Sequence, residues 1–316
     1  MDKIGTDITR AASILAQGGL VGIPTETVYG LAANAFSPEA VVKIFEAKKR
    51  PLFDPLIVHT HSLEAALVFV TAIPNRARKI FDAFAPGPIT ILLERNKEKI
   101  PDLVTSGLDT VAVRIPNHPV TLNLLQELNF PLAAPSANPF GYVSPTTAQH
   151  VQQHLGAEVD YILDGGASEV GLESTIVGFE DGKVIIYRLG GLSVEDIEGV
   201  VGKVELQVNS SSDPRAPGQL KSHYAPGKKL YLEGSEPKGS DYSKAAYIGF
   251  DNLHKDIKPE NQLLLSKGGN INEAAQKLFA ALRKTDALDV DIVISAKFPE
   301  SGLGMAINDR LKRAAG

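Results

Sequence analysis

Apolar residues in the first 200 positions switch repeatedly between helical and strand-like spacing. Residues 8–15 carry apolar side chains along one helical stripe that stops at Gly18-Gly19, and the apolar run at 20–23 is typical of a buried strand. A second helix is predicted to begin with Ser37 as its cap and Pro38 in its first turn, and to end in basic residues before Pro51. Further helices are expected at 74–84, 118–128 and 147–155, and further strands at 56–58, 89–93, 111–115, 132–134, 161–163, 175–177 and 184–189. The pattern predicts an α/β domain with helices beside a sheet.

Turn-forming residues divide the rest of the chain. Glu180-Asp181-Gly182 lies between two strand-like runs and predicts a hairpin, so the sheet is expected to be mixed. Residues 209–218 are almost all of turn and linker type. Beyond them, a smaller, doubly wound α/β domain is predicted from strands at 229–232, 245–250, 263–265 and 291–295 and a helix at 271–282. The expected organisation is a first domain at 1–208, a linker at 209–227 and a second domain at 228–316.

The composition fits a folded protein and excludes several kinds of chemistry. Of 316 residues, 43% are apolar and 22% charged, which is close to the ordinary soluble mixture. The net charge of −5 argues against a protein built mainly to bind nucleic acid, although it allows a local basic pocket. The lack of cysteine excludes disulfides, thiolate metal sites and cysteine nucleophiles. Because no segment resembles a signal peptide or approaches the roughly 20 apolar residues that span a bilayer, we expect a cytoplasmic protein.

Common cofactor and hydrolase motifs are missing from the sequence. It contains no G-x-x-x-x-G-K-[ST] loop, no G-x-G-x-x-G, no G-x-S-x-G and no H-E-x-x-H. His59 and His61 alternate along a strand end without a third ligand nearby, so a histidine-based metal site is not expected.

Polar and charged residues occur at the ends of several predicted strands, where a plain α/β core does not need them. Arg114 interrupts an apolar strand, so it must face solvent or meet an anionic partner. Lys48 and Arg50 lie at a helix end and are able to clamp phosphate, although without further context a solvated helix end is the favoured interpretation. Thr25-Glu26-Thr27, Ser136 and Asn138 either form turns or contact a ligand. Glu173-Ser174-Thr175 opens a strand and Arg188 closes one, which repeats the pattern of polar groups at strand ends. Together these residues predict a pocket for an anionic, hydroxyl-rich ligand at one edge of the sheet.

The order of these motifs resembles the threonylcarbamoyl-AMP synthase family. The resemblance is carried by Pro24-Thr25-Glu26-Thr27-Val28-Tyr29-Gly30-Leu31, Lys48-x-Arg50, Pro55-Leu56-Ile57-Val58-His59, Ser136-x-Asn138, Glu173-Ser174-Thr175-Ile176-Val177 and Ser222-His223-Tyr224-Ala225-Pro226. It covers most of residues 6–227, whereas the last domain matches only in length and pattern. The implied fold is the long form of the family, with a YrdC-like twisted mixed sheet and flanking helices followed by a small Rossmann-like α/β domain.

The resemblance implies a nucleotidyltransferase reaction. L-Threonine, bicarbonate and ATP would give threonylcarbamoyl-AMP and pyrophosphate, and the product would supply the modification of adenosine 37 in tRNA through the downstream tRNA threonylcarbamoyl transferase machinery. Mg²⁺ is expected to arrive with ATP, without protein side chains as metal ligands and without an organic cofactor. No membrane association and no stable tRNA binding are expected.

Site residues follow from the resemblance position by position. Lys48 and Arg50 would be catalytic, because cations stabilise the charge that accumulates on departing pyrophosphate. L-Threonine would be held by Thr27, His59, Arg114, the backbone at Ala134, and Ser174. ATP would be held by Arg50, Asp54, Thr110, Ser136, Asn138, Ser144, Arg188 and Tyr224. Asp54 departs from the asparagine of many members, and its carboxylate would repel triphosphate unless it meets a cation or Mg²⁺.

Two alternatives to this synthase hypothesis and one question about the linker stay open at this point. A binding module could grip RNA with the same basic concave face and perform no chemistry. A carbamoyl-phosphate-dependent modifying enzyme would need further metal-binding or acylphosphatase-like segments, which the sequence does not show. The linker at 209–227 is expected to fold over the site as a lid that excludes water, and a plain tether is the alternative.

Overall fold

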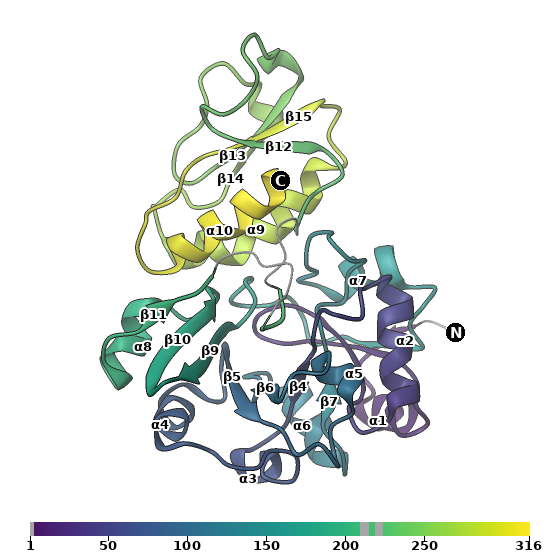
Figure 1. Cartoon of the computed structure of the whole chain (residues 1–316). Coiled ribbons are helices and arrows are strands. Elements are labelled where there is room, and N and C mark those ends of the chain that lie inside the picture. Colours follow the sequence, from purple (N-terminus) through teal and green to yellow (C-terminus); the bar gives the residue numbers. More distant parts are fainter. Residues whose placement is uncertain (1–2, 209–214, 219–223) are drawn as a thin grey trace.

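Two β-sheets form the framework of the protein, and Figure 1 shows them one above the other. The computed structural model describes residues 3–208, 215–218 and 224–316. The larger sheet has the order β1-β8-β2-β3-β7-β4-β6-β5-β9-β10-β11 and mixes parallel and antiparallel pairs, whereas the smaller sheet, β12-β15-β13-β14, is parallel throughout. The strands are β1 (Ile4–Gly5), β2 (Val21–Ile23), β3 (Gly30–Asn34), β4 (Ile57–His59), β5 (Ile89–Glu94), β6 (Thr110–Arg114), β7 (Leu132–Ala133), β8 (Tyr161–Leu163), β9 (Thr175–Glu180), β10 (Lys183–Arg188), β11 (Glu205–Leu206), β12 (Lys229–Leu232), β13 (Ala245–Gly249), β14 (Gln262–Leu264) and β15 (Ile292–Ser295).

Helices flank both sheets, as the sequence pattern predicts. They are α1 (Ile8–Ala16), α2 (Pro38–Lys48), α3 (Leu63–Ala66), α4 (Asn75–Phe84), α5 (Asp102–Thr105), α6 (Pro119–Glu127), α7 (Ala148–Leu155), α8 (Val194–Val201), α9 (Ile271–Thr285) and α10 (Leu303–Ala315). No helix in the described ranges is long and apolar enough to cross a membrane.

Local sequence explains the best-predicted elements. The Ser37 side chain accepts a hydrogen bond from the Ala40 amide at the start of α2, and Lys49 closes the helix in the left-handed region with φ 51°. The predicted hairpin is confirmed: β9 and β10 pair antiparallel, and Asp181 and Gly182 between them both have positive φ. The predicted mixed sheet is therefore confirmed as well.

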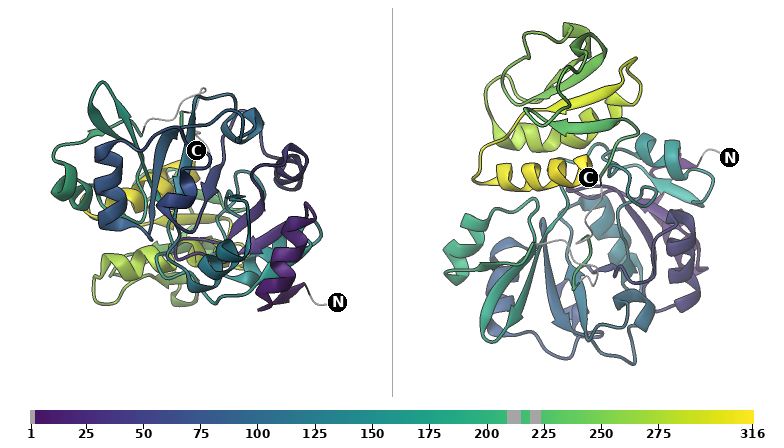
Figure 2. Two further views of the ribbon diagram at one scale, coloured as in Figure 1. Left: turned by 90° about the horizontal axis from the view of Figure 1, so that it is seen from below. Right: turned by 45° about the horizontal axis from the view of Figure 1, so that its top comes forward.

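Other elements differ from the prediction. No strand is predicted at β3, because Gly30–Asn34 is mostly small and has neither alternation nor β-branched side chains, yet β3 pairs with both β2 and β7. No helix is predicted at α10 either. The second domain has its predicted parallel sheet, but both α9 and α10 lie on one side of it, facing the larger domain (Figures 1 and 2). The connections at 233–244 and 250–261 are rich in turn residues and form only short 3-10 turns, so no helix of the described residues covers the other face of this sheet. The segment around Ile257 packs on that face instead.

The two domains share one hydrophobic core. A single cluster of buried residues runs from Val177 in β9 through Tyr224 to Phe279 in α9 and Ala246 in β13. Gly171 lies against α9, where a Cβ atom would come within 2.5 Å of the Gln276 Cα, and its φ of +73° also favours glycine. Helices α9 and α10 are thus packed directly on the larger domain.

Candidate active site

A pocket lies where strands of the large sheet end, beneath helix α10. Including its open mouth it has a volume of about 560 Å³, a size typical of small-molecule sites. It brings together Thr27, Arg50, His59, Arg114, Ala134, Ser136, Ser174, Arg188 and Tyr224 from the sequence-predicted set, and adds Thr25, Val28, Gly30, Pro55, Ile57, Pro135, Glu173, Pro217 and Gly218. Lys48, Asp54, Thr110, Asn138 and Ser144 lie outside this lining.

The register of the sheet explains why distant residues meet. His59 is the last residue of β4 and lies opposite Arg114, the last residue of the parallel strand β6. Arg188 ends β10 and lies opposite Ile176 in β9, just after Ser174. Strands β4, β6, β5, β9 and β10 are consecutive neighbours in the sheet. The side chains at these strand ends therefore meet at one edge of the sheet.

The loop after β2 is held in a tight polar turn. The Thr25 hydroxyl accepts hydrogen bonds from the amides of Thr27 (3.3 Å) and Val28 (3.2 Å) and donates to the Val28 carbonyl (2.6 Å). The Thr27 hydroxyl lies 2.8 Å from that of Thr25. Thr25 therefore fixes the conformation in which Thr27 reaches the pocket.

Arg114 forms a buried ion pair with Glu26, which lies in the predicted polar run but was assigned no ligand. Its Nη2 lies 2.8 Å from Glu26 Oε2, and both side chains are about 95% buried. The pair lacks hydrogen-bond geometry, so Nε and Nη2 of Arg114 have no hydrogen-bond partner among the described residues. Two donors on one side of a guanidinium match the two oxygens of a carboxylate.

His59 is electrically neutral at physiological pH. Burial, and next the positive charge of Arg114, lower the pKa of its imidazole to about 3. Its Nδ1 has no hydrogen-bond partner within the described residues. A neutral imidazole beside Arg114 is able to accept a hydrogen bond from an amino or hydroxyl group of a ligand.

Arg50 and Asp54 form a second buried pair. Arg50 follows the left-handed end of α2, donates to the carbonyls of Asp54 (3.0 Å) and Pro55 (2.8 Å), and lies 2.8 Å from the Asp54 carboxylate. The cation that an aspartate needs at this position is therefore supplied by the protein. Asp54 itself is fully buried behind Arg50, and its side chain also accepts a hydrogen bond from the Gly218 amide (3.4 Å).

Lys48 and Asn138 support the turn that carries Ser136. The buried ammonium of Lys48 donates to the carbonyl oxygens of Ser136 (2.5 Å) and Asn138, and burial, followed by the charge of Arg50, lowers its pKa. The Asn138 amide donates to the carbonyls of Pro139 (2.9 Å) and Tyr142 (2.8 Å). Both side chains thus act on the backbone of the turn rather than on the pocket.

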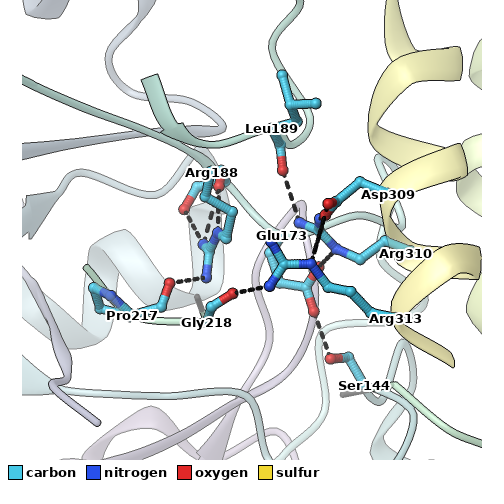
Figure 3. A network of polar contacts seen from close by, with 10 residues as sticks. Ser144, Glu173, Arg188, Leu189, Pro217, Gly218, Asp309, Arg310 and Arg313 are labelled. Carbon is cyan, nitrogen blue, oxygen red and sulfur yellow. Dashed lines mark hydrogen bonds and ion pairs between the residues drawn. The ribbon is translucent and has the colours of Figure 1, made fainter. Parts of the chain in front are cut away.

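Glu173 and Arg188 form the wall of the pocket on the side of α10 (Figure 3). Ser144, fully buried behind the wall, donates to one Glu173 carboxylate oxygen (2.6 Å). Burial alone would raise the pKa of Glu173, but Arg310 and Arg188 outweigh it and bring the pKa to about 2. Arg188 donates to the carbonyl of Ser174 (2.9 Å), its hydroxyl (3.1 Å) and the Pro217 carbonyl (3.3 Å). Although burial lowers its pKa to about 10, Arg188 is charged at neutral pH.

The described part of the expected linker covers the pocket. Ala216 is buried against Ile57 and Ile176 on the sheet face. At Gly218, φ is +78°, and a Cβ would lie 3.1 Å from Arg188 Nη1. Tyr224 stacks on Phe279 of α9 with ring centroids 5.6 Å apart. Ser222 and His223, which belong to the same motif, lie outside the described residues, and the domain boundaries and the lid remain predictions.

Thr110 is not brought into this pocket. It lies on the same face of β6 as Arg114 but at the opposite end of the strand, about 13 Å away at the usual rise per residue. There it lines a neighbouring hollow with Tyr187 and Arg215. Ala112, midway between Thr110 and Arg114 in β6, is buried in one cluster with Ala216.

Residues missed by the sequence reasoning are mainly the paired carboxylates Glu26 and Glu173. Each glutamate lies in a polar run that predicts part of the pocket, but the hydroxyl residues beside it, and not the glutamate itself, indicate a ligand contact. Within the described ranges, no group of three or more His, Cys, Asp or Glu residues is arranged to hold a metal ion.

Comparisons with known proteins match this chain along its whole length. A family model described as "Telomere recombination" matches residues 13–190, and one described as "Threonylcarbamoyl-AMP synthase, C-terminal domain" matches residues 192–316. The chain is 38% identical to the threonylcarbamoyl-AMP synthase of Pyrococcus abyssi (strain GE5 / Orsay), over 98% of this chain and 94% of the relative. It is 36% identical to that of Bacillus subtilis (strain 168), over 100% and 95%. The crystal structure of P. abyssi Sua5 complexed with L-threonine superposes with a TM-score of 0.90 at 38% identity, covering 98% of this chain and 94% of that one.

Proposed function

The chain belongs to the threonylcarbamoyl-AMP synthase family, and we propose that its pocket binds L-threonine beside ATP and joins them through bicarbonate. The predicted family and fold are confirmed, and the protein is an enzyme with threonylcarbamoyl-AMP synthase activity, a nucleotidyltransferase-type reaction. A catalytic role is thereby favoured over an RNA-binding module without chemistry.

One half of the pocket suits L-threonine, which a structurally similar relative was crystallised with. The carboxylate would accept hydrogen bonds from Nε and Nη2 of Arg114, which make none with the described residues, although Nη2 is also in the ion pair with Glu26. The amino and hydroxyl groups would meet neutral His59, Thr27 and Ser174, and the methyl group would meet the apolar Val28 and Ile57. The backbone at Ala134 completes this side of the pocket.

The other half suits a nucleotide triphosphate. Arg50 and Arg188 present guanidinium groups, which match phosphate oxygens in their fork geometry, and Ser136 adds a hydroxyl group. Tyr224 offers an aromatic ring held by Phe279. Mg²⁺ would enter with the phosphates of ATP as part of the substrate. The contacts of ATP with Asp54, Thr110, Asn138 and Ser144 and the catalytic part of Lys48 remain predictions. In the structure Asp54, Asn138 and Lys48 hold neighbouring residues of the pocket, so they would act at least by positioning them.

The reaction would run in two steps. The threonine amine attacks the bicarbonate carbon, and loss of water gives a carbamate on the amine nitrogen. A carbamate oxygen then attacks the α-phosphorus of ATP. The bond from the α-phosphorus to the oxygen that bridges it to the β-phosphorus breaks, and pyrophosphate leaves with that oxygen and its negative charge. Arginines stabilise that charge, and the rest of the acceleration would come from holding the reactants close together. The product would be the donor for the threonylcarbamoyl group of tRNA adenosine 37.

A single observation carries this proposal: donors suited to an amino acid and donors suited to phosphate line one hollow, in a chain that matches threonylcarbamoyl-AMP synthases over its full length. The test is mass spectrometry of the product formed from L-threonine, ATP, Mg²⁺ and ¹³C-bicarbonate. We expect threonylcarbamoyl-AMP that carries one ¹³C atom, and little of it from Arg114→Met. A product without the label would contradict the proposed route.

A further inference from the structure

Helix α10 of the second domain reaches the wall of the pocket. Arg310 is fully buried; its Nε donates to Glu173 Oε2 (2.8 Å), and its Nη2 donates to the Leu189 carbonyl (2.8 Å). Its guanidinium carbon lies 4.9 Å from the centre of the Tyr224 ring. Figure 3 shows Arg310 extending from α10 toward Glu173, whose other carboxylate oxygen accepts from Ser144.

The charges around the pocket are paired in a regular way. Glu26 pairs with Arg114, Asp54 with Arg50 and Glu173 with Arg310, each at 2.8 Å. Arg188 differs, because its contacts in the described parts of the chain go to carbonyl and hydroxyl oxygens and not to a carboxylate. Arg188 therefore contributes to the pocket a positive charge that makes no direct contact with a carboxylate of the described residues.

Glu173 and Arg188 are neighbours in the wall of the pocket, because Arg188 donates to the carbonyl of Ser174, the residue that follows Glu173. Each also affects the other's pKa: Arg188 lowers the pKa of Glu173, and Glu173 raises that of Arg188. A buried carboxylate without a cationic partner is strongly destabilising, so it is expected to form an ion pair with the nearest other cation. Without Arg310, that cation is Arg188, and the free positive charge of the pocket would be cancelled.

We propose that Arg310 of the second domain is a positioning residue of the active site, which binds Glu173 and so keeps Arg188 available for the triphosphate of ATP. The inference rests on the proposed function, because it assigns Arg188 to the nucleotide. It gives the second domain a direct part in nucleotide binding, at a distance of one side chain from the pocket.

The test compares the KM for ATP with the KM for L-threonine in charge variants of this pair. Arg310→Met is expected to raise the KM for ATP at least tenfold and the KM for threonine much less, since removing one partner of a buried ion pair leaves the other charge uncompensated. Adding Glu173→Gln to Arg310→Met removes the carboxylate that would capture Arg188, so most of the affinity for ATP should return. Calorimetric titration with MgATP gives the same comparison without turnover.

Arg283→Met is the matched control. Arg283 is another buried arginine at the interface, and its Nε donates to the Ser144 carbonyl (3.3 Å) rather than to Glu173. Loosening of the interface would affect both variants, but Glu173→Gln should restore ATP binding only to Arg310→Met. Circular dichroism and thermal unfolding establish that each variant is folded.

Several results would overturn the inference. They are an unchanged KM for ATP in Arg310→Met, equal losses for both substrates, and no recovery in the double variant. Should Arg310→Met not fold, Glu173→Gln alone decides. Arg188 then has no carboxylate to pair with, so the KM for ATP should stay at or below the wild-type value, and an increase would refute the idea. A wild-type enzyme that makes no threonylcarbamoyl-AMP would instead defeat the proposed function, so the two failures are distinguishable.

Discussion

His59 shows how one buried side chain links the pocket to pH. The imidazole has a pKa of about 3 in the folded protein, against 6.5 for an ordinary histidine, so it takes up a proton near neutral pH only when the chain unfolds. The folded state is therefore favoured above pH 6.5 and loses stability as the pH falls toward 3. From pH 7.5 to 5 this residue should cost about 2 kcal/mol of unfolding free energy.

Urea unfolding of the wild type and of His59→Gln at both pH values measures this cost. Both proteins keep His118 and His150, whose pKa values are also lowered by burial, so their contributions cancel in the comparison. The wild type should lose about 2 kcal/mol more than the variant on acidification. Equal losses would show that His59 is protonated in the folded protein.

For single residues of the site, the sequence allowed arginines, lysines and hydroxyl residues to be predicted more readily than carboxylates. Arg114 was detectable because a charged residue interrupted an apolar strand. Glu26 and Glu173 were not, since their importance comes from the arginines that pair with them across the fold. Nothing in a local pattern distinguishes such a glutamate from one in a solvated turn.

Helix α2 supports the pocket through the side chain in its last turn. Replacing Lys48 by Met removes the donor to two buried carbonyls, and leaving them unsatisfied should cost about 1–3 kcal/mol of stability. The turn that carries Ser136 should then shift, so the rate of pyrophosphate release is expected to fall as well. Chemical unfolding and a coupled pyrophosphate assay measure the two effects.

Lys43 provides the control on the same helix. Its exposed ammonium donates to the Gly18 carbonyl at the surface, so Lys43→Met should change stability by less than about 0.5 kcal/mol and leave turnover intact. If Lys48→Met behaved like Lys43→Met, the buried contacts with the turn would be irrelevant to the site.

Elements with a clear apolar pattern were predicted, whereas a helix cap alone was not enough: α8 begins at the capping residue Ser193 and was missed. Helix α2 was predicted because Ser37 and Pro38 mark its start and basic residues its end. Strand β3 was missed because Gly30–Asn34 lacks a strand pattern and forms a strand only through its neighbours β2 and β7. Its pairing is a tertiary effect that overrides local preference.

At the scale of the whole molecule, the shared core predicts that both domains unfold together. Tyr224 and Phe279 stack inside the one cluster that spans the domains. Although two-domain proteins often unfold in stages, scanning calorimetry should show one transition here. Phe279→Ala should destabilise the protein by about 3–5 kcal/mol and move the whole transition to lower temperature. Two separate transitions, with the first domain unaffected, would show that the domains are energetically independent.

The relation between the domains could not be predicted from the sequence. Composition and turn residues indicated a second α/β unit, but the contact of Arg310 with Glu173 joins residues 137 positions apart. Such a contact depends on how α10 packs, and the sequence pattern had not predicted that helix at all. The role of the second domain therefore became arguable only from the structure.

The central claim is that one pocket holds an amino acid and a nucleotide close enough to react. It is tested most directly by pyrophosphate release from MgATP with L-threonine and bicarbonate each supplied or withheld. We expect release only when both are present, because the carbamate formed from them is the group that displaces pyrophosphate. Release at the same rate without threonine would contradict the account.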